Sequence, residues 1–254
     1  MTTFFPFARR TYREILRDPV SLIFGMAFPL IIMVVIQMIL KNSFVEDEKL
    51  LEFYRIDNLM IAISIYSFSF TSFYAGVRVS KDKNEGYIQR FYSSNLTLED
   101  YLLGYIAPLL LITFLQSVMC ITTAFILDAI LSLDVLHFGF NYLVLILMML
   151  PCELIFILIG LMLGCSFKAK ESIGIFVGII IVTIMTSNIF FPAESFGSGY
   201  VLFCKILPFY PTVTALNCLL NGISEAFPYY FVTLVYLAVL LALSIVIFKI
   251  KMYK

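Results

Sequence analysis

Residues 142–165 read YLVLILMMLPCELIFILIGLMLGC, a run in which Glu153 is the single charged side chain. A helix needs about 20 apolar residues to cross a hydrocarbon core of about 30 Å. A charged group at the helix centre costs about 2.5–3.5 kcal/mol on insertion, and each Leu, Ile, Val or Phe contributes about 0.3–0.6 kcal/mol in the opposite direction. This stretch therefore predicts a transmembrane helix in spite of Glu153.

The whole chain has the composition of a membrane protein. Of its 254 residues, 61% are hydrophobic and 13% are charged, against about 45–50% and about 25% in soluble domains. A soluble fold of this size could not bury so much apolar surface, because its interior is a limited share of its volume. The net charge is zero, so no overall basic field favours nucleic acid as a partner.

Six runs are long and apolar enough to span a bilayer, namely 20–40, 58–77, 101–126, 142–165, 173–191 and 231–248. Lysine and arginine gather before the first run, in the 78–100 segment, between the fourth and fifth runs, and at the C-terminus. By the positive-inside rule, these segments face the cytoplasm. We therefore expect a multi-pass protein of the cell membrane with both termini in the cytoplasm.

The segment 192–228 contains a further apolar stretch, 200–220, which is interrupted by Lys205, Pro208 and Pro211. Proline breaks the helical hydrogen bonding that a backbone exposed to lipid requires. We therefore expect an outer re-entrant segment with short helices at about 200–207 and 212–220. A disulfide between Cys204 and Cys218 is possible there, with buried thiols as the alternative.

The N-terminal segment 1–18 has the pattern of an amphipathic helix. Its apolar side chains alternate with a basic face that contains Arg9, Arg10, Arg13 and Arg17. Such a helix lies in the membrane interface with its arginines toward anionic headgroups. It can be an anchor or a lever that moves with the first span. Within that span, Pro29 is expected to kink the helix and to free a backbone carbonyl.

The 78–100 segment is the longest cytoplasmic stretch between two predicted spans. A short helix after Gly86 would bring Ile88, Phe91 and Tyr92 onto one face by their i, i+3, i+4 spacing. Apolar side chains displayed beside charges can dock into a groove of a cytoplasmic partner. The alternative is a solvated connector whose aromatic residues rest on the bilayer.

Polar and small residues within the spans suggest internal contacts or a path. Glu153, Ser67 and Thr71 are candidates for a translocation path, because an intramembrane carboxylate usually faces a cavity or the bundle interior. A hydrogen-bonded helix–helix contact is the alternative. The spaced pairs Gly160/Gly164 and Gly174/Gly178 flank a short loop, which indicates a tight hairpin within the chain or, alternatively, a subunit interface.

No catalytic or metal site is expected in this chain. His137 is the single histidine, whereas a metal site needs several converging ligands. The nucleophile motif G-x-S-x-G and the phosphate-binding motif G-x-x-x-x-G-K-[ST] are both absent from the sequence. A membrane enzyme acting on lipid would need clustered acids or histidines, and Glu153 stands alone. The chain is therefore expected to be neither an enzyme nor an ATP-binding subunit.

Several motifs and their order carry a family resemblance. Residues 17–19 read RDP and lead into the span that holds Pro29, and residues 81–91 read KDKNEGYIQRF. After the fifth span come FPAE at 191–194 and LPFYPT at 207–212. Over nearly its whole length the chain resembles the permeases of type-2 ATP-binding cassette (ABC) transporters, which are exporter subunits.

The resemblance implies a single transmembrane permease domain over 1–254. Its fold would be an all-α membrane protein of six transmembrane helices, with an N-terminal amphipathic interfacial helix, a cytoplasmic coupling helix, and short outer re-entrant helices before the last span. The coupling segment resembles the family's acidic–glycine–Thr–Leu–x–Arg signature, with Tyr87-Ile88 in place of Thr-Leu. The residues that would couple to the ATPase are Asp82, Glu85, Gly86, Ile88, Arg90 and Phe91.

The resemblance also implies partners. A separate ABC ATP-binding subunit would bind ATP and Mg²⁺, and a second permease chain would complete a homo- or heterodimer surrounded by membrane lipid. The apolar, aromatic-rich helices suit export of an amphiphile such as a drug, a lipid or an antimicrobial peptide. The alternatives are export of a cell-surface polysaccharide, or a membrane channel or assembly protein without ATP coupling.

Overall fold

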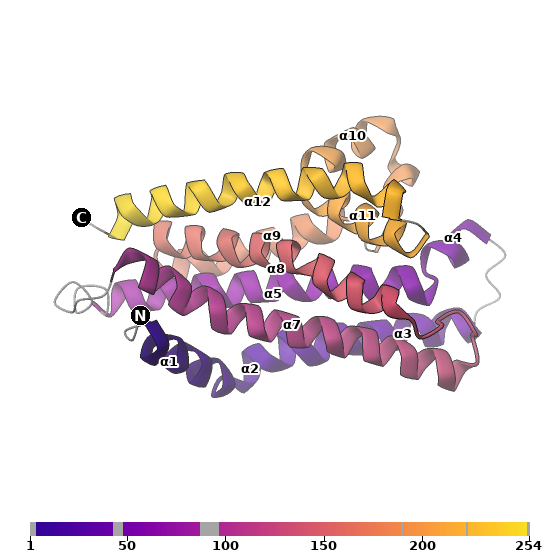
Figure 1. Cartoon of the computed structure of the whole chain (residues 1–254), viewed down its shortest axis with the longest axis horizontal. Coiled ribbons are helices and arrows are strands. Elements are labelled where there is room, and N and C mark those ends of the chain that lie inside the picture. Colours follow the sequence, from indigo (N-terminus) through magenta and orange to yellow (C-terminus); the bar gives the residue numbers. More distant parts are fainter. Residues whose placement is uncertain (1–3, 43–47, 87–96, 189, 222, 253–254) are drawn as a thin grey trace.

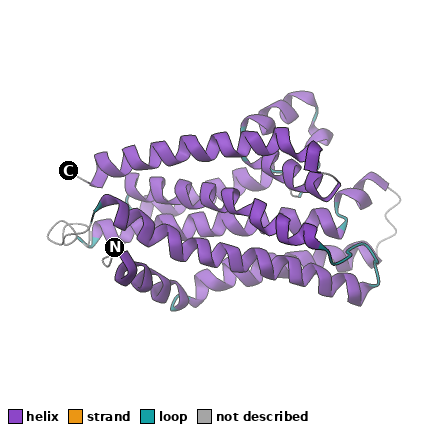
Figure 2. Cartoon of the chain, viewed as in Figure 1, coloured by secondary structure: helices purple, strands orange, loops and turns teal. Residues whose placement is uncertain are grey.

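The computed structural model describes residues 4–42, 48–86, 97–188, 190–221 and 223–252, and these form helices joined by short loops, without a strand (Figure 2). The helices are α1 (Phe4–Leu16), α2 (Pro19–Leu22), the π-helix η1 (Ile23–Ala27), α3 (Phe28–Asn42), α4 (Glu48–Phe53), α5 (Ile56–Asn84), α7 (Leu98–Leu131), α8 (Phe140–Ser166), α9 (Ala169–Thr186), the 3-10 helix η2 (Ala193–Phe196), α10 (Ser198–Ile206), α11 (Phe209–Asn221) and α12 (Ile223–Met252).

Within the described residues, five helical segments are long and apolar enough to cross a membrane: Ile23–Asn42, Ile56–Asn84, Glu99–Leu131, Phe140–Ser166 and Ala226–Lys251. They lie lengthwise in one bundle (Figure 1). The prediction of an all-α membrane protein with several spans is therefore confirmed.

The predicted fifth span corresponds to α9, which has 18 residues and is about 27 Å long at a rise of 1.5 Å per residue. Helices α10 and α11 together also have the length and apolarity of a span, but the pair is bent by 93°. The beginning of α1 and the end of α12 lie at the same end of the bundle, which we call the terminal end (Figure 1). The two termini can lie on the same side of a membrane only if the chain crosses it an even number of times. If α9 crosses the membrane and the α10–α11 pair only re-enters it, the chain makes six crossings. Both of these features stay predictions.

Helix α5 extends further than the sequence indicated. The predicted span ended at residue 77, yet the helix continues through the mostly polar residues 78–84 to Asn84. Helix α7 then begins at Leu98 with a capping box, in which the Thr97 hydroxyl accepts from the Asp100 N–H at 3.2 Å and Asp100 accepts from the Thr97 N–H at 3.1 Å. Within the described part of the predicted 78–100 loop, residues 78–84 and 98–100 are therefore helical. The central residues 87–96 lie outside the described part of the chain.

Helix α5 is the centre of the bundle and contacts α3, α7, α8, α9 and α11. In its most apolar stretch 78% of the residues are buried, against 22% for the first span and 17% for the last. Two of the α5 serines bond back to their own helix, Ser64 to the Met60 carbonyl at 2.7 Å and Ser69 to the Tyr66 carbonyl at 2.6 Å. This back-bonding lets a serine-rich helix occupy the interior.

Helix α8 approaches α5 closely through Gly160 and Gly164. A Cβ atom on Gly160 would lie 2.3 Å from the Ser72 carbonyl oxygen, and one on Gly164 would lie 2.5 Å from the Gly76 carbonyl oxygen. By contrast, a Cβ on Gly174 or Gly178 would meet no atom within 4 Å. The predicted close packing within the chain is present at Gly160 and Gly164. The expected partner was wrong, because the small residues that receive α8 lie on α5 and not on α9.

This contact generates a matched pair of predictions. Gly160→Ala should lower the free energy of unfolding by about 1–3 kcal/mol, because the added methyl group collides with rigid backbone. Gly178→Ala should be neutral or stabilising by about 0.5–1 kcal/mol, because alanine favours a helix more than glycine does. Titration of the protein in mild micelles with a denaturing detergent measures both. Equal effects of the two substitutions would contradict the assigned helix contact.

Candidate functional site

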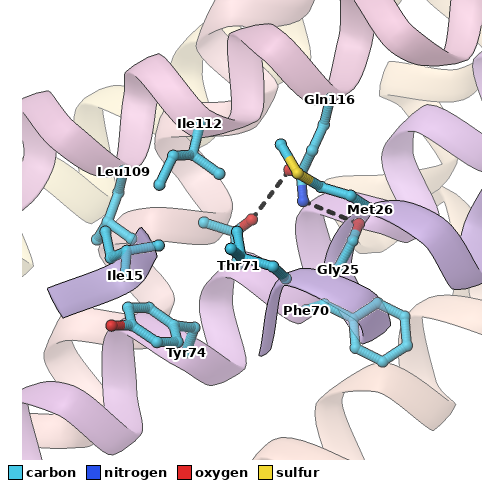
Figure 3. Close-up of a pocket in the computed structure, with 10 residues that line it drawn as sticks. Ile15, Gly25, Met26, Phe70, Thr71, Tyr74, Leu109, Ile112 and Gln116 are labelled. Carbon is cyan, nitrogen blue, oxygen red and sulfur yellow. Dashed lines mark hydrogen bonds between the residues drawn. The ribbon is translucent and has the colours of Figure 1, made fainter. Parts of the chain in front are cut away.

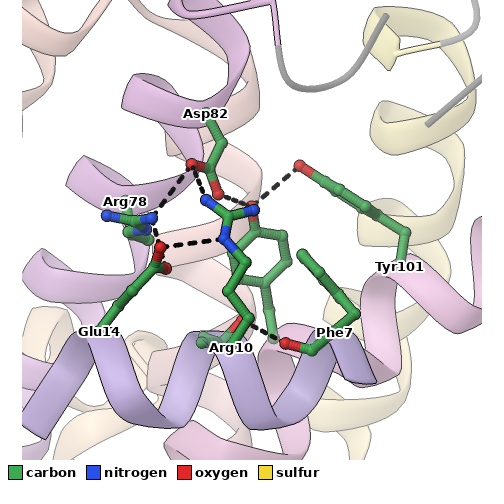
Figure 4. A network of polar contacts seen from close by, with 8 residues as sticks. Phe7, Arg10, Glu14, Arg78, Asp82 and Tyr101 are labelled. Atoms are coloured by element: carbon green, nitrogen blue, oxygen red, sulfur yellow. Dashed lines mark hydrogen bonds and ion pairs between the residues drawn. The ribbon is translucent and has the colours of Figure 1, made fainter. Parts of the chain in front are cut away.

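Asp82 lies in the last turn of α5 at the terminal end and is 1% exposed. Its carboxylate accepts hydrogen bonds from the Arg10 guanidinium, at 3.2 Å from Nη2 to Oδ1, and from the Tyr105 hydroxyl at Oδ2. Arg78 Nη2 lies 3.4 Å from Oδ1. Three helices, α1, α5 and α7, therefore place donors around one buried carboxylate (Figure 4).

Glu14 of α1 completes a charge-balanced cluster, the α5 clamp, formed by Arg10, Glu14, Arg78, Asp82 and Tyr105. The Glu14 carboxylate accepts from Arg10 Nε at 2.9 Å and pairs with Arg78 Nη2. The two arginines and two carboxylates have no net charge. Burying charges is tolerable when each has a hydrogen-bonded counter-charge, and here the pairing connects α1 to α5.

An aromatic contact seats α1 on α7 beside the clamp. Phe7 stacks on Tyr101 with ring centroids 5.3 Å apart, and it meets Tyr105 edge-on at 5.0 Å. The ring occupies the space that Gly104 leaves open, because a Cβ there would lie 1.9 Å from Phe7 Cδ1. Figure 4 shows Phe7 and Tyr101 beside the ion cluster. Helix α1 is thus docked by both packing and charge.

The opposite side of the α5 end is tied to α8 and α9. The Ser80 hydroxyl donates to the Gly164 carbonyl at 2.9 Å and lies 2.7 Å from the Ser172 hydroxyl oxygen. Lys83 Nζ donates to the Cys165 carbonyl at 2.5 Å. Gly164 and Cys165 belong to the last turn of α8, whose carbonyls have no partner within their own helix. These bonds satisfy that turn and hold α5 from a second side.

The start of the first span is held in a similar way. Pro29 has no N–H and cannot donate to the carbonyl of Gly25 four residues earlier, and the backbone over Ile23–Ala27 is a π-helix. Gln116 Nε2 of α7 donates to the Gly25 carbonyl at 2.9 Å, and the Thr71 hydroxyl donates to Gln116 Oε1 at 3.1 Å (Figure 3). The freed carbonyl that the sequence predicted therefore has a donor on α7, Gln116, which Thr71 of α5 in turn contacts.

The predicted coupling residues fall into two groups. Asp82 is buried in the α5 clamp, whereas Glu85 is exposed at the C-cap of α5, and Gly86 follows with φ of +70°. A left-handed residue after a helix end is typically glycine. Ile88, Arg90 and Phe91 lie outside the described residues. Contact of this segment with an ATPase therefore stays a prediction.

The residues proposed for a translocation path are buried within the single chain. Glu153 is 0% exposed, and its two oxygens accept from Thr113 at 2.9 Å and from Ser117 at 2.7 Å, both on α7. Ser67 donates to the Ser64 carbonyl at 2.7 Å. Thr71 borders a hollow beside Gln116. This arrangement favours a helix–helix contact for Glu153, the alternative that the sequence left open.

Arg10, Glu14, Arg78 and Tyr105 were not predicted as site residues. Two i, i+4 pairs, Arg10–Glu14 and Arg78–Asp82, are readable in the sequence as salt bridges along one helix face. Their interlocking across α1 and α5 is not readable, since nothing local indicates which helix face meets which.

The described residues contain no group of three or more His, Cys, Asp or Glu side chains that could hold a metal ion. The structure contains no disulfide between Cys204 and Cys218.

The α5 clamp makes a stability prediction. Asp82→Asn should lower the free energy of unfolding by about 2–4 kcal/mol, because it removes one of the two carboxylates that neutralise Arg10 and Arg78 and leaves Glu14 alone to balance two partly buried arginines. The matched control is Arg55→Gln, which breaks the Arg55–Asp57 pair, where the arginine side chain is 45% exposed; its cost should be below about 1 kcal/mol. Denaturing-detergent titration measures both, and a cost for Asp82→Asn no larger than that of the control would contradict the clamp.

Comparisons with known proteins identify the family. The family model described as ABC-2 type transporter matches residues 2–220. Neither the search of curated proteins nor the search of solved structures found a match. The matched region includes the α5 clamp, the central helix α5 and the α10–α11 pair. The chain therefore belongs to the ABC-2 type transporter family and is a permease subunit of an ABC transporter.

Proposed function

We propose that this permease exports its substrate, driven by ATP and Mg²⁺ bound in a separate ABC ATP-binding subunit, and that it works as a dimer with a second permease chain of the same or a different kind. In this arrangement the terminal end of the bundle faces the cytoplasm. The basic residues gathered there support this orientation through the positive-inside rule.

The α5 clamp is the observation that carries the proposal. The segment that resembles the coupling helix, residues 81–91, begins within the last turn of α5, and that turn is bonded to α1 through Asp82 and to α8 through Lys83. If the ATPase displaces that segment, α5 should move with it, because the bonds of its last turn keep this helix end from fraying. Because α5 is one helix from Ile56 to Asn84, the displacement would extend from the cytoplasmic face to the outer end of the bundle.

The proposed cargo is an amphiphile such as a drug, a lipid or an antimicrobial peptide. Only 22% of the residues in the apolar stretch of the first span and 17% of those in the last are buried within the chain, so the membrane or a second permease chain must cover the apolar side chains left exposed. A substrate that partitions into the bilayer reaches such surfaces without a soluble receptor domain.

The proposal predicts a stable complex with an ABC ATP-binding subunit encoded beside this chain. Co-expression and affinity purification should recover both chains together, with ATP hydrolysis in the complex. Arg90→Ala and Phe91→Ala should each reduce recovery of the partner or uncouple hydrolysis from transport. Lys170→Ala, which removes an exposed cation at the start of α9, is the control and should leave both unchanged. Wild-type coupling in the Arg90 and Phe91 variants would contradict the proposed docking segment.

Transport by the reconstituted complex tests the position of Glu153. Because its carboxylate is hydrogen-bonded between α7 and α8, Glu153→Gln should change the transport of cationic and neutral amphiphiles by the same factor. Vesicle uptake assays with a matched pair of fluorescent amphiphiles measure the ratio. A selective loss of cationic transport would contradict the helix-contact role and place Glu153 on the substrate path.

A further inference from the structure

The first span is held at both of its ends. At the terminal end, the α5 clamp fixes α1, and the four residues of α2 lead from there into η1. At the opposite end, Gln37 Nε2 donates to the Tyr54 carbonyl at 2.9 Å. Lys41 Nζ donates to the Leu131 carbonyl at 3.0 Å. A displacement of one end relative to the other therefore has to be taken up within the span.

Regular helical hydrogen bonding in this span is interrupted at η1 and Pro29. The Phe28 N–H donates to the Ile23 carbonyl, which is five residues earlier instead of the usual four. Pro29 has no N–H to offer to the Gly25 carbonyl. Sharp bends in helices occur at prolines and at π-bulges, and π-bulges are frequent at functional sites. Only 22% of the apolar stretch of the span is buried within the chain, so little packing opposes a bend here.

The side chain of Gln116 on α7 holds the span at this interruption. It is buried, and its Nε2 donates to the Gly25 carbonyl at 2.9 Å, while its Oε1 accepts from the Thr71 hydroxyl at 3.1 Å (Figure 3). A Cβ atom on Gly25 would lie 3.1 Å from Nε2, so the glycine lets the amide come close to the backbone. One buried amide thus joins the first span, α7 and α5 at the level of η1.

Thr71 connects this amide to the helix that carries the α5 clamp. It lies eleven residues before Asp82 in α5, which is one continuous helix from Ile56 to Asn84. Eleven residues of α-helix are about 16 Å long, and rigid helices are among the elements that carry energetic coupling between distant sites. A displacement of the clamped end of α5 therefore also displaces the Thr71 hydroxyl that bonds to Gln116.

We propose that η1 and Pro29 form the hinge of the first span, and that Gln116 is the positioning residue that sets this hinge according to the position of α5. In the structure, the Gln116 amide fixes the hinge at the Gly25 carbonyl. A displacement of α5 carries the Thr71 hydroxyl away from Oε1, and the amide, then held at one end only, can turn away from Gly25. The inference rests on the proposed function in one respect, since ATP-driven movement of α5 supplies the displacement.

Hydrogen–deuterium exchange of the chain alone in nanodiscs tests the hinge. Gln116→Leu keeps the size of the side chain but removes the donor, so the amides of residues 23–28 should exchange roughly tenfold faster, as expected for the loss of one buried hydrogen bond. The matched control is Gln37→Leu, which removes the other buried glutamine bond of the first span and should leave residues 23–28 at their wild-type rates. Wild-type exchange of residues 23–28 in Gln116→Leu, or equal acceleration there by Gln37→Leu, would overturn the hinge.

Transport by the reconstituted complex with its ATP-binding subunit tests the link from α5 to the hinge. Thr71→Val removes the hydroxyl with little change of shape, so the number of ATP molecules hydrolysed per substrate molecule transported should rise roughly fivefold, as expected for the loss of one neutral hydrogen bond. Thr122→Val is the control, because the exposed Thr122 hydroxyl bonds to the Val118 carbonyl of its own helix, and it should keep the wild-type ratio.

The two measurements separate the hinge from the proposed function. A wild-type ratio of ATP to substrate in Thr71→Val would overturn the role of Gln116 as the positioning residue, even if the exchange result stands. A wild-type complex that hydrolyses ATP without moving any substrate would overturn the proposed function and the link from α5 with it. The exchange rates of residues 23–28 would still decide the hinge, because that measurement uses the chain alone.

Discussion

Asp82 is buried in the last turn of the central helix α5, so its negative charge needs hydrogen-bonding and positively charged partners there. Arg10, Arg78 and Tyr105 provide these partners from three helices, because a buried carboxylate without partners would be far more costly than any single packing defect. The position of α1 and the length of α5 both depend on this contact. In an ABC permease, the same contact places the N-terminal interfacial helix and the proposed coupling segment on one mechanical unit.

The same requirement recurs along α5. Several polar groups that enter the interior are paired with a group from another helix or with the backbone of their own helix, whereas the buried Ser72 hydroxyl on α5 has no hydrogen-bond partner within the described part of the chain. Gln116 donates to the Gly25 carbonyl, which Pro29 leaves without its usual helical donor. Lys83 donates to a carbonyl in the last turn of α8. Thr113 and Ser117 donate to the carboxylate of Glu153. Where there is no polar group, close backbone packing takes over, as at Gly160. Helix α5 is therefore the central helix against which α3, α7, α8, α9 and α11 pack.

Apolar run length, helical periodicity and the positions of prolines are local properties, and they predicted the class of fold, the N-terminal helix and the break between α10 and α11. The mostly polar residues 78–84 were predicted to be part of a loop. They are helical, and the residues to which their side chains bond, such as Arg10 and Cys165, are remote in the sequence. The spacing of Gly160 and Gly164 predicted close helix packing. The residues of α5 that they contact, Ser72 and Gly76, form no sequence pattern that would have identified α5 as the partner helix. The pairing of α1 with α5 therefore had to come from the three-dimensional structure.

Hydrogen–deuterium exchange of the unmodified chain in lipid nanodiscs tests the central claim that the last turns of α5 are clamped. If they are, the amides of residues 78–84 exchange as slowly as those deep in the bundle, although they lie at its end. Exchange of residues 78–84 at the rate of a frayed helix terminus would contradict the account, because an end that opens freely could not transmit force into the bundle.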